Sequence, residues 1–191
     1  MNRCQDYAKR LASAILEFDW SPVEHLTDEL SLCWEQKRTV FLCGNGGSAG
    51  NAIHLANDLL YGVGAGKRPG LRVEALSANP AVLTCLANDI SYDAIFSEQL
   101  SAKAQKDDLL VVLSGSGNSS NVVKALEVAR HLELRTAAIV GYSGGACKTL
   151  AECVIHLQID DMQIAEDFQL IVGHMCMQAL ADTDTDNFEY Q

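Results

Sequence analysis

Short apolar runs alternate with helical stretches along most of this chain, and this alternation is the feature that most restricts its fold. Each run is five or six residues long and has Gly or Asp as a direct neighbour in the sequence. Strands that alternate with helices predict a mostly parallel sheet with helices on both faces. We therefore expect an α/β fold, a three-layer doubly wound sandwich around a five-stranded parallel sheet in flavodoxin-like order. The predicted strands are Thr39–Cys43, Leu71–Leu76, Leu109–Leu113, Thr136–Val140 and Val154–Ile159.

Two amphipathic helices precede the first strand, and a sheet of this type does not need them. Their apolar residues recur at helical spacing over Asp6–Phe18 and Val23–Trp34. Ser21-Pro22 is expected to open the second helix, with Ser as N-cap and Pro at the first helical position. Further helices are predicted at Ala49–Leu60, Ala94–Gln105, Ser120–His131, Lys148–Ala151 and Ile164–Leu180.

Length and charge limit the classes of function. The chain has 191 residues, enough for one domain, which we place at 1–181 with a helical extension over 1–36 and a polar tail at 182–191. Its formal net charge is −11, which argues against direct binding of nucleic acid or of an anionic membrane. Hydrophobic residues make up 48% and charged residues 20%, a composition typical of globular proteins.

The N-terminus and the cysteines predict a cytoplasmic protein. Met1–Leu16 carries charges throughout and lacks the apolar region of a signal peptide, and no apolar run approaches the ~18 residues of a membrane span. The seven cysteines are odd in number and form no Cys-x-x-Cys pair. We expect reduced thiols buried as small apolar residues, with no role as a zinc site or nucleophile.

A first phosphate-type corner follows the first strand. Cys43 leads into Gly44-Asn45-Gly46-Gly47-Ser48 and then into a helix. Glycines let backbone N–H groups turn inward, and the start of a helix adds partial positive charge. Asn45 and Ser48 add side-chain donors, so Asn45, Gly46, Gly47 and Ser48 are candidate binding residues.

A second corner has the same architecture and more hydroxyl groups. The strand Leu109–Leu113 leads into Ser114-Gly115-Ser116-Gly117-Asn118-Ser119-Ser120. Hydroxyls and backbone amides can hold a phosphate without Lys or Arg, which suits an acidic protein. Neither corner has the Gly-Lys-Ser/Thr ending of a P-loop or the pattern of a dinucleotide site, so nucleotide hydrolysis and dinucleotide binding are disfavoured.

Histidine and carboxylate side chains form a possible metal or acid–base cluster. His54 lies on the helix that begins at the first corner, and Asp58 follows at i+4 on the same face. On the last helix, Glu166 and His174 are eight residues apart, about two turns. Such pairs suit a zinc-class ion or general acid–base chemistry, and they also occur as polar surface residues of amphipathic helices.

Together, these motifs resemble the sugar isomerase (SIS) domain family, in particular its phosphoheptose isomerase branch. The likeness covers nearly the whole chain and rests on Gly44–Ser48, His54, Asn88-Asp89, Ser114–Ser119, Gly141–Gly145 and the helix with Glu166 and His174.

The resemblance implies a sugar-phosphate substrate and a homotetramer with active sites at subunit interfaces. The expected reaction converts sedoheptulose 7-phosphate to the aldose D-glycero-D-manno-heptose 7-phosphate through an enediolate. Ser114, Ser116 and Ser119, with Gly115, would hold the phosphate, and Asn45, Ser48, Asn88 and Asp89 would contact the sugar. One Zn²⁺ per site would be held by His54, Asp58, Glu166 and His174, of which Asp58 or Glu166 would be the general base and His174 the partner acid.

Two residues depart from the family pattern, because Asp58 and Glu166 stand where phosphoheptose isomerases carry Glu and Gln. These departures leave two alternatives open. One is an isomerase or epimerase of another sugar phosphate. The other is a non-catalytic SIS protein that acts as an adaptor of a DNA-replication initiator. The metal-competent side chains at all four positions favour an enzyme.

Overall fold

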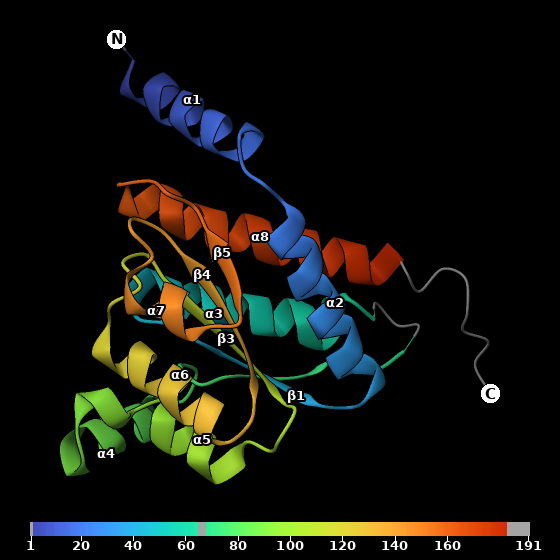
Figure 1. Ribbon diagram of the computed structural model, residues 1–191, viewed down its shortest axis with the longest axis vertical. Helices are drawn as coiled ribbons and strands as arrows, with labels where there is room; N and C mark the ends of the chain where they lie inside the picture. The colour runs from blue at the N-terminus through green and yellow to red at the C-terminus, as the bar shows by residue number, and fades with distance from the viewer. Residues whose placement is uncertain (1, 65–67, 183–191) are drawn as a thin grey trace.

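The computed structural model describes residues 2–64 and 68–182, and a five-stranded parallel sheet lies at its centre (Figure 1). The strand order is β2-β1-β3-β4-β5, which is the predicted flavodoxin-like order. All four strand pairs are parallel. The prediction of five strands is confirmed, although β5 ends three residues before the predicted Ile159. The strands are β1 (Thr39–Cys43), β2 (Arg72–Ala75), β3 (Leu109–Ser114), β4 (Arg135–Val140) and β5 (Cys153–His156).

Helices cover both faces of the sheet and make the predicted three layers. One face carries α2, α3 and α8, and the opposite face carries α4, α5, α6 and α7 (Figure 1). Their bounds are α2 (Ser21–Glu35), α3 (Gly46–Asn57), α4 (Pro80–Asp89), α5 (Ser97–Lys103), α6 (Ser120–His131), α7 (Gly145–Leu150) and α8 (Met162–Asp182).

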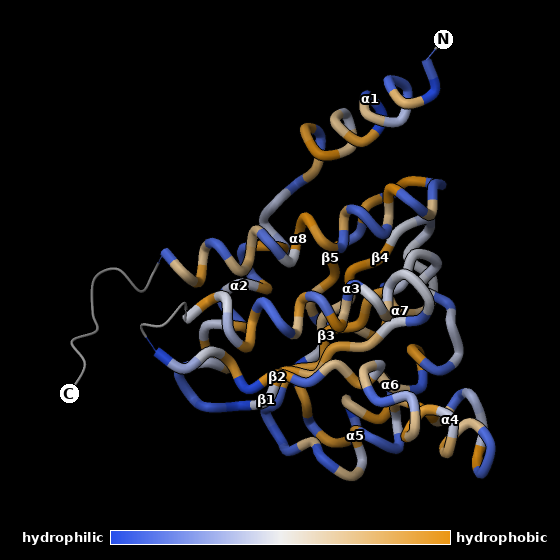
Figure 2. Tube along the Cα trace, turned by 180° about the vertical axis from the view of Figure 1, so that it is seen from behind, coloured by the Kyte–Doolittle hydropathy of each residue, from blue (hydrophilic) through white to orange (hydrophobic). Residues whose placement is uncertain are grey.

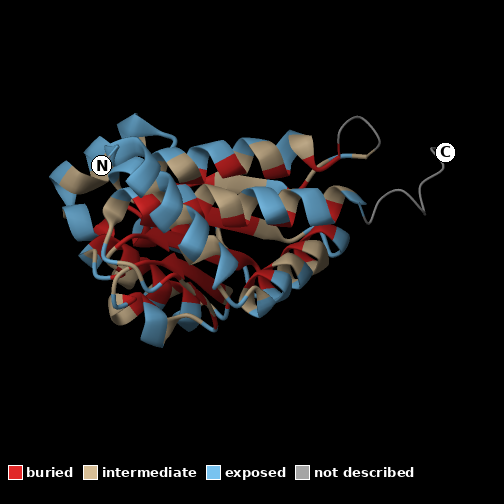
Figure 3. Ribbon diagram, turned by 90° about the horizontal axis from the view of Figure 1, so that it is seen from above, coloured by how far each residue is buried: buried red, intermediate tan, exposed pale blue. Residues whose placement is uncertain are grey.

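The central strands β1, β3 and β4 are buried on both faces and mostly apolar, whereas the edge strands β2 and β5 are only partly buried. Successive side chains of a strand point to opposite faces. In β1, Val40 and Leu42 belong to the core under α2, α3 and α8, whereas Phe41 and Cys43 belong to the core under α5 and α6. Figure 3 shows the resulting concentration of buried residues in the strands between the helical layers.

The first helix, α1 (Arg3–Leu16), lies outside the layers, beyond α8, and has no buried residue (Figure 2). Two polar contacts hold it to α8 and to the residue that precedes α8. The Tyr7 hydroxyl donates to Asp167 at 2.5 Å, and the Arg10 guanidinium pairs with Asp161 at 2.5 Å. The Asp167 hydrogen bond raises the pKa of Tyr7 to about 12. By contrast, α2 contributes five buried residues to the core.

Two predictions for the helices are wrong, for local reasons. Ser21 is the first residue of α2 rather than its N-cap, because the Asp19 carboxylate accepts hydrogen bonds from both the backbone N–H and the hydroxyl of Ser21. Helix α4 was not predicted, although Asn79-Pro80 is a start signal. The Asn79 side chain accepts from the backbone N–H groups of Ala81 and Val82.

The other predicted helices occur with shifted ends. Ala94–Gln105 contains the end of a 3₁₀ turn, η2 (Tyr92–Ala94), followed by α5. Asp182 ends α8, and the rest of the predicted tail lies outside the described residues. Within the described part of the chain, no helix is both long and apolar enough to cross a bilayer.

All seven cysteines are free thiols, as the sequence predicts, but only five of them are buried. Cys4 and Cys85 are exposed, which corrects the expectation that all seven are packed inside. Burial raises the pKa of the Cys33, Cys147, Cys153 and Cys176 thiols to about 11. The buried thiols therefore stay protonated and unreactive at neutral pH.

Candidate functional site

The two phosphate-type corners lie side by side because β1 and β3 are neighbours at the point where the strand order reverses. Cys43 pairs with Val112, so the loops that follow leave the same edge of the sheet. The corners are in direct contact: a Cβ built on Gly44 would lie 2.7 Å from the carbonyl oxygen of Leu113. Ligands of doubly wound folds bind at this switch point, which makes the paired corners the candidate site.

A pocket of about 270 Å³, which we call the serine pocket, opens between the two corners. The N-termini of α3 and α6 start at these corners and contribute partial positive charge. Among the described residues that line it, none is Lys, Arg or His. It is lined by Asn45, Gly46, Gly47, Ser48, Leu113, Ser114, Gly115, Ser116, Ser119, Met162 and Glu166.

Three serine hydroxyls of the pocket already accept a hydrogen bond from the protein. Ser114 Oγ accepts from the Gly117 N–H at 3.0 Å, Ser116 Oγ from the Asn118 N–H at 3.3 Å, and Ser48 Oγ from the Gln169 amide at 3.0 Å. Because a hydroxyl has one hydrogen to donate, each of them keeps its O–H for a ligand. These three hydroxyls are therefore neutral donors that suit an anion, and the Glu166 carboxylate borders the same pocket.

Asn45 stands at the border between this pocket and a second one of about 250 Å³. Its side-chain amide is hydrogen-bonded to Asn121 and to the hydroxyl of Tyr92. The second pocket, named here the apolar pocket, also contains Leu83, Ile95 and Phe96. No sequence motif points to Asn121, Tyr92 or Gln169. Asn121 and Gln169 are buried polar residues that only the fold places beside the corners.

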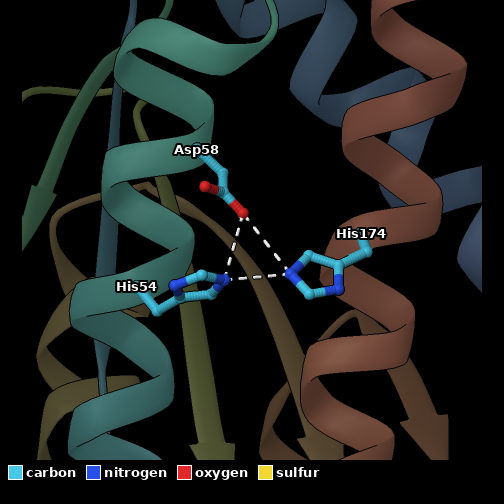
Figure 4. Close-up of side chains that lie close together, drawn as sticks. All are labelled: His54, Asp58 and His174. Atoms are coloured by element: carbon cyan, nitrogen blue, oxygen red, sulfur yellow. Dashed lines mark hydrogen bonds and ion pairs between the residues drawn. The ribbon is translucent and has the colours of Figure 1, made fainter.

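His54, Asp58 and His174 form the second part of the site, between α3 and α8 (Figure 4). His54 Nε2 lies 3.0 Å from His174 Nε2 and 3.3 Å from Asp58 Oδ2, and His174 Nε2 lies 3.4 Å from the same carboxylate oxygen. Both imidazoles are about half exposed, with relative areas of 49% and 47%, whereas the Asp58 carboxylate is 18% exposed. We call these three residues the His–Asp–His cluster.

The cluster lies where α3 changes its winding. Asp58 begins a π-helical turn, η1 (Asp58–Gly62), and the N–H of Val63 donates to the carbonyl of Asp58 at 3.1 Å. Single π turns inside α-helices are frequent at functional sites. His54 and Asp58 keep their i, i+4 contact because the α-helical winding extends to Asn57.

Glu166 is not part of the cluster, and it borders the serine pocket instead. A Cβ built on Gly47 would meet the Glu166 carboxylate at 2.4–2.5 Å, so this side chain lies across the start of α3. Eight helical residues place Glu166 and His174 about 12 Å apart along α8 and about 80° apart around it. The sequence expectation that both lie roughly on one side of the helix overlooked that rotation.

Asn88 and Asp89, at the end of α4, border neither of these two pockets. The Asn88 amide donates to Asp89 Oδ1 at 2.7 Å, and this bond lowers the pKa of Asp89. The thiol of Cys85 contacts the other carboxylate oxygen at 3.4 Å. Sugar contacts by Asn88 and Asp89 therefore stay a prediction.

Comparison with known proteins gives one consistent result. Residues 4–141 match the family model described as the SIS domain. A phosphoheptose isomerase of Akkermansia muciniphila is 41% identical over 138 residues, which are 71% of each chain. A phosphoheptose isomerase of Chlorobaculum parvum is 34% identical over 174 residues, 90% of this chain and 83% of that one. The solved structure of a phosphoheptose isomerase from Francisella tularensis superposes with a TM-score of 0.88 at 25% identity, over 95% of this chain and 97% of that one.

Proposed function

This chain belongs to the SIS domain family and, within it, to the phosphoheptose isomerases, and from that membership we propose that it isomerises sedoheptulose 7-phosphate to the corresponding aldose phosphate. The serine pocket would take the phosphate, and the His–Asp–His cluster would act at the other end of the sugar. The proton removed from C1 is returned to C2, and the hydroxyl proton of O1 moves to O2, so that C1 becomes an aldehyde and the C2 ketone becomes a hydroxyl.

The observation that carries this proposal is the spacing of the two parts of the site. Glu166 borders the serine pocket and His174 belongs to the cluster, about 12 Å further along α8. An extended chain advances about 1.2 Å per bond, so the eight bonds from C1 to phosphorus of a heptose 7-phosphate span about 10 Å. A pentose 5-phosphate, with six bonds, spans only about 7 Å. The rise between these two backbone positions is closer to the length of a heptose 7-phosphate than to that of a pentose 5-phosphate.

The cluster also has the donor set for zinc. Ligand atoms about 2.1 Å from a tetrahedral ion lie about 3.4 Å from one another, and the three separations here are 3.0, 3.3 and 3.4 Å. Three protein ligands that leave one position open are typical of catalytic zinc. His54, Asp58 and His174 would hold the ion, whose positive charge would stabilise the negative charge of an enediolate. Glu166 is too far along α8 to complete this set.

For the general base, Asp58 is favoured over Glu166. Asp58 belongs to the cluster, and its second oxygen, Oδ1, has only a 3.4 Å contact with Asn57. That oxygen can take a proton from C1 and return it to C2. Glu166 borders the phosphate end, about 10 Å from the reacting carbons of an extended substrate.

His174 is a candidate zinc ligand and a candidate general acid, and its Nε2 atom cannot serve in both roles. Nε2 cannot bind zinc and donate a proton at the same time, and it is Nε2 that faces Asp58 and His54. If the purified protein contains metal, His174 is assigned as a metal ligand. If the metal-free protein is active, His174 is assigned as the partner acid. Metal analysis of the purified protein therefore assigns the role.

Activity on a panel of ketose phosphates tests the function. Pentulose, hexulose and heptulose phosphates are incubated with zinc-loaded protein in D₂O, and the products are followed by NMR. We expect fastest conversion of sedoheptulose 7-phosphate. Deuterium at C2 of the aldose measures how far the transferred proton exchanges with solvent before it is returned. Faster conversion of a pentulose or hexulose phosphate would identify that sugar phosphate as the substrate. A metal-free oligomer that binds none of the sugar phosphates would indicate the adaptor role.

Assembly and location are further parts of the proposal. A homotetramer is supported by α1, which has no buried residue and ends in Leu16, whose side chain is 84% exposed. Light scattering on the purified protein measures this state, and a monomer would contradict it. A cytoplasmic location stays a prediction from the sequence.

A further inference from the structure

The Asn45 side chain has its hydrogen-bonding capacity almost completely used inside the protein. Its Nδ2 donates to Asn121 Oδ1 at 2.8 Å, and its Oδ1 accepts from Asn121 Nδ2 at 2.9 Å. The hydroxyl of Tyr92 donates to the same oxygen at 3.0 Å. An amide oxygen has two lone pairs and an amide nitrogen two hydrogens, so a single N–H remains for a ligand.

Asn121 is placed to hold this arrangement. It lies in the first turn of α6, directly after the second corner, and its exposed fraction is 0%. Asn45 is in the first corner, so the amide pair connects the two corners at side-chain level. A buried amide without its partner costs more than an exposed one, which fixes the pair in its bonded geometry.

Tyr92 makes the third hydrogen bond to the Asn45 side chain. In the arrangement of the structure, the hydroxyl of Tyr92 donates to Asn45 Oδ1 and occupies its second lone pair. Tyr92 itself is 57% exposed and borders the apolar pocket, so it is not held there by core packing.

We propose that Asn121 and Tyr92 are positioning residues that occupy the carbonyl oxygen of Asn45, so that Asn45 meets the substrate only as a hydrogen-bond donor to a substrate oxygen. The inference rests on the proposed function for the identity of the ligand, a sugar phosphate. It assigns no direct contact with the substrate to Asn121. Both residues act through Asn45.

A double-mutant cycle tests the inference. The variants are Asn45→Ala, Asn121→Ala and the double variant, and the measurements are Kd for sedoheptulose 7-phosphate by calorimetry, KM, kcat and the melting temperature. One hydrogen bond corresponds to about a 2- to 10-fold change in Kd. We expect each single variant to raise Kd and KM about 10-fold, and the double variant to raise them no further, because the effect of Asn121 requires Asn45.

The control is Thr136→Val, which removes a buried hydrogen bond of Thr136 Oγ1 with the N–H of Glu152 at the other end of the sheet. It should lower the melting temperature and leave Kd and KM unchanged. Tyr92→Phe, at an exposed position, gives a variant that folds even where Asn121→Ala does not, and we expect a 2- to 5-fold rise in Kd that disappears in the Asn45→Ala background.

The outcomes separate this inference from the proposed function. The positioning role would be refuted by an unchanged Kd in both Asn121→Ala and Tyr92→Phe. It would also be refuted if the double variant bound the sugar phosphate about 100-fold more weakly than wild type. The isomerase function would stand in both cases. Binding of the sugar phosphate without isomerisation would refute the function and leave the cycle in Kd interpretable. A wild-type protein that binds no sugar phosphate would refute both.

Discussion

Replacing Gly44 by Ala should separate the two corners, because no space exists for a side chain between them. A Cβ at this position would lie 2.7 Å from the carbonyl oxygen of Leu113 and 2.8 Å from the Cβ of Ser48. Ordinary contacts start near 3.4 Å. The first neighbour is backbone of β3, which is held in register with β1 through Cys43 and Val112, so it cannot move away freely.

The size of the effect follows from overpacking. Forcing an extra methyl group into a packed interior costs about 1–3 kcal/mol. For a chain of this length, 1 kcal/mol corresponds to a shift of about 2–4 °C in melting temperature, so Gly44→Ala should lower it by about 2–12 °C. A shift of the corner by a few tenths of an ångström misaligns the serine donors, and we expect Kd for a sugar phosphate to rise about 10-fold.

The matched control is Gly50→Ala, in helix α3, which follows the corner that contains Gly44. A Cβ at Gly50 meets nothing within 4 Å, and Ala is favoured over Gly inside a helix by up to about 1 kcal/mol. The melting temperature should therefore rise by about 2–4 °C, with Kd unchanged. Calorimetry and thermal unfolding measure both quantities. Equal stability and equal Kd in Gly44→Ala and wild type would refute the direct packing of the corners.

Four further predictions concern the cluster, the pocket, α1 and the thiols. His174→Ala should reduce turnover by at least about 100-fold while calorimetry still detects sugar-phosphate binding. The control His131→Ala, at the exposed end of α6, should change neither turnover nor binding. Unchanged turnover in His174→Ala would remove His174 from the reaction. Ser114→Ala and Ser116→Ala should each raise Kd for inorganic phosphate about 2- to 10-fold, and equal affinities would argue against the serine pocket as the phosphate site. The pKa of Tyr7 is raised from 10.0 to about 12 by folding, so the contribution of Tyr7 to stability is complete below pH 10 and is lost as the pH rises towards 12. The free energy of chemical unfolding should show this loss in wild type and not in Tyr7→Phe. A thiol reagent at pH 8 should modify Cys4 rapidly, Cys85 more slowly because its hydrogen bond to Asp89 raises the pKa of the thiol, and the five buried thiols only after unfolding. Rapid modification of all seven would contradict the packing of the core.

The sequence determined the features that depend on neighbours along the chain. Apolar runs separated by helices predict a parallel sheet with both faces covered, because the runs of the central strands are apolar on both sides. The Gly- and Ser-rich corners follow from the need for tight turns into helices, and the contact of His54 with Asp58 follows from i, i+4 spacing on one helix. Local signals failed at α4, where a single Asn-Pro step marked the start, and at α2, where Ser21 is the first helical residue and not the N-cap.

The tertiary structure decided which of these local features meet. The strand order brings the two corners together, since β1 and β3 are 66 residues apart between Cys43 and Leu109 and pair only in the folded sheet. The packing of α8 against α3 places His174 beside His54 and turns Glu166 towards Gly47, because rotation of a helix about its axis is fixed by its neighbours and not by its own spacing. The amide pair of Asn45 and Asn121 has the same origin. The two residues are far apart in sequence, and the fold places Asn45 beside the buried Asn121, whose amide has no water to bond.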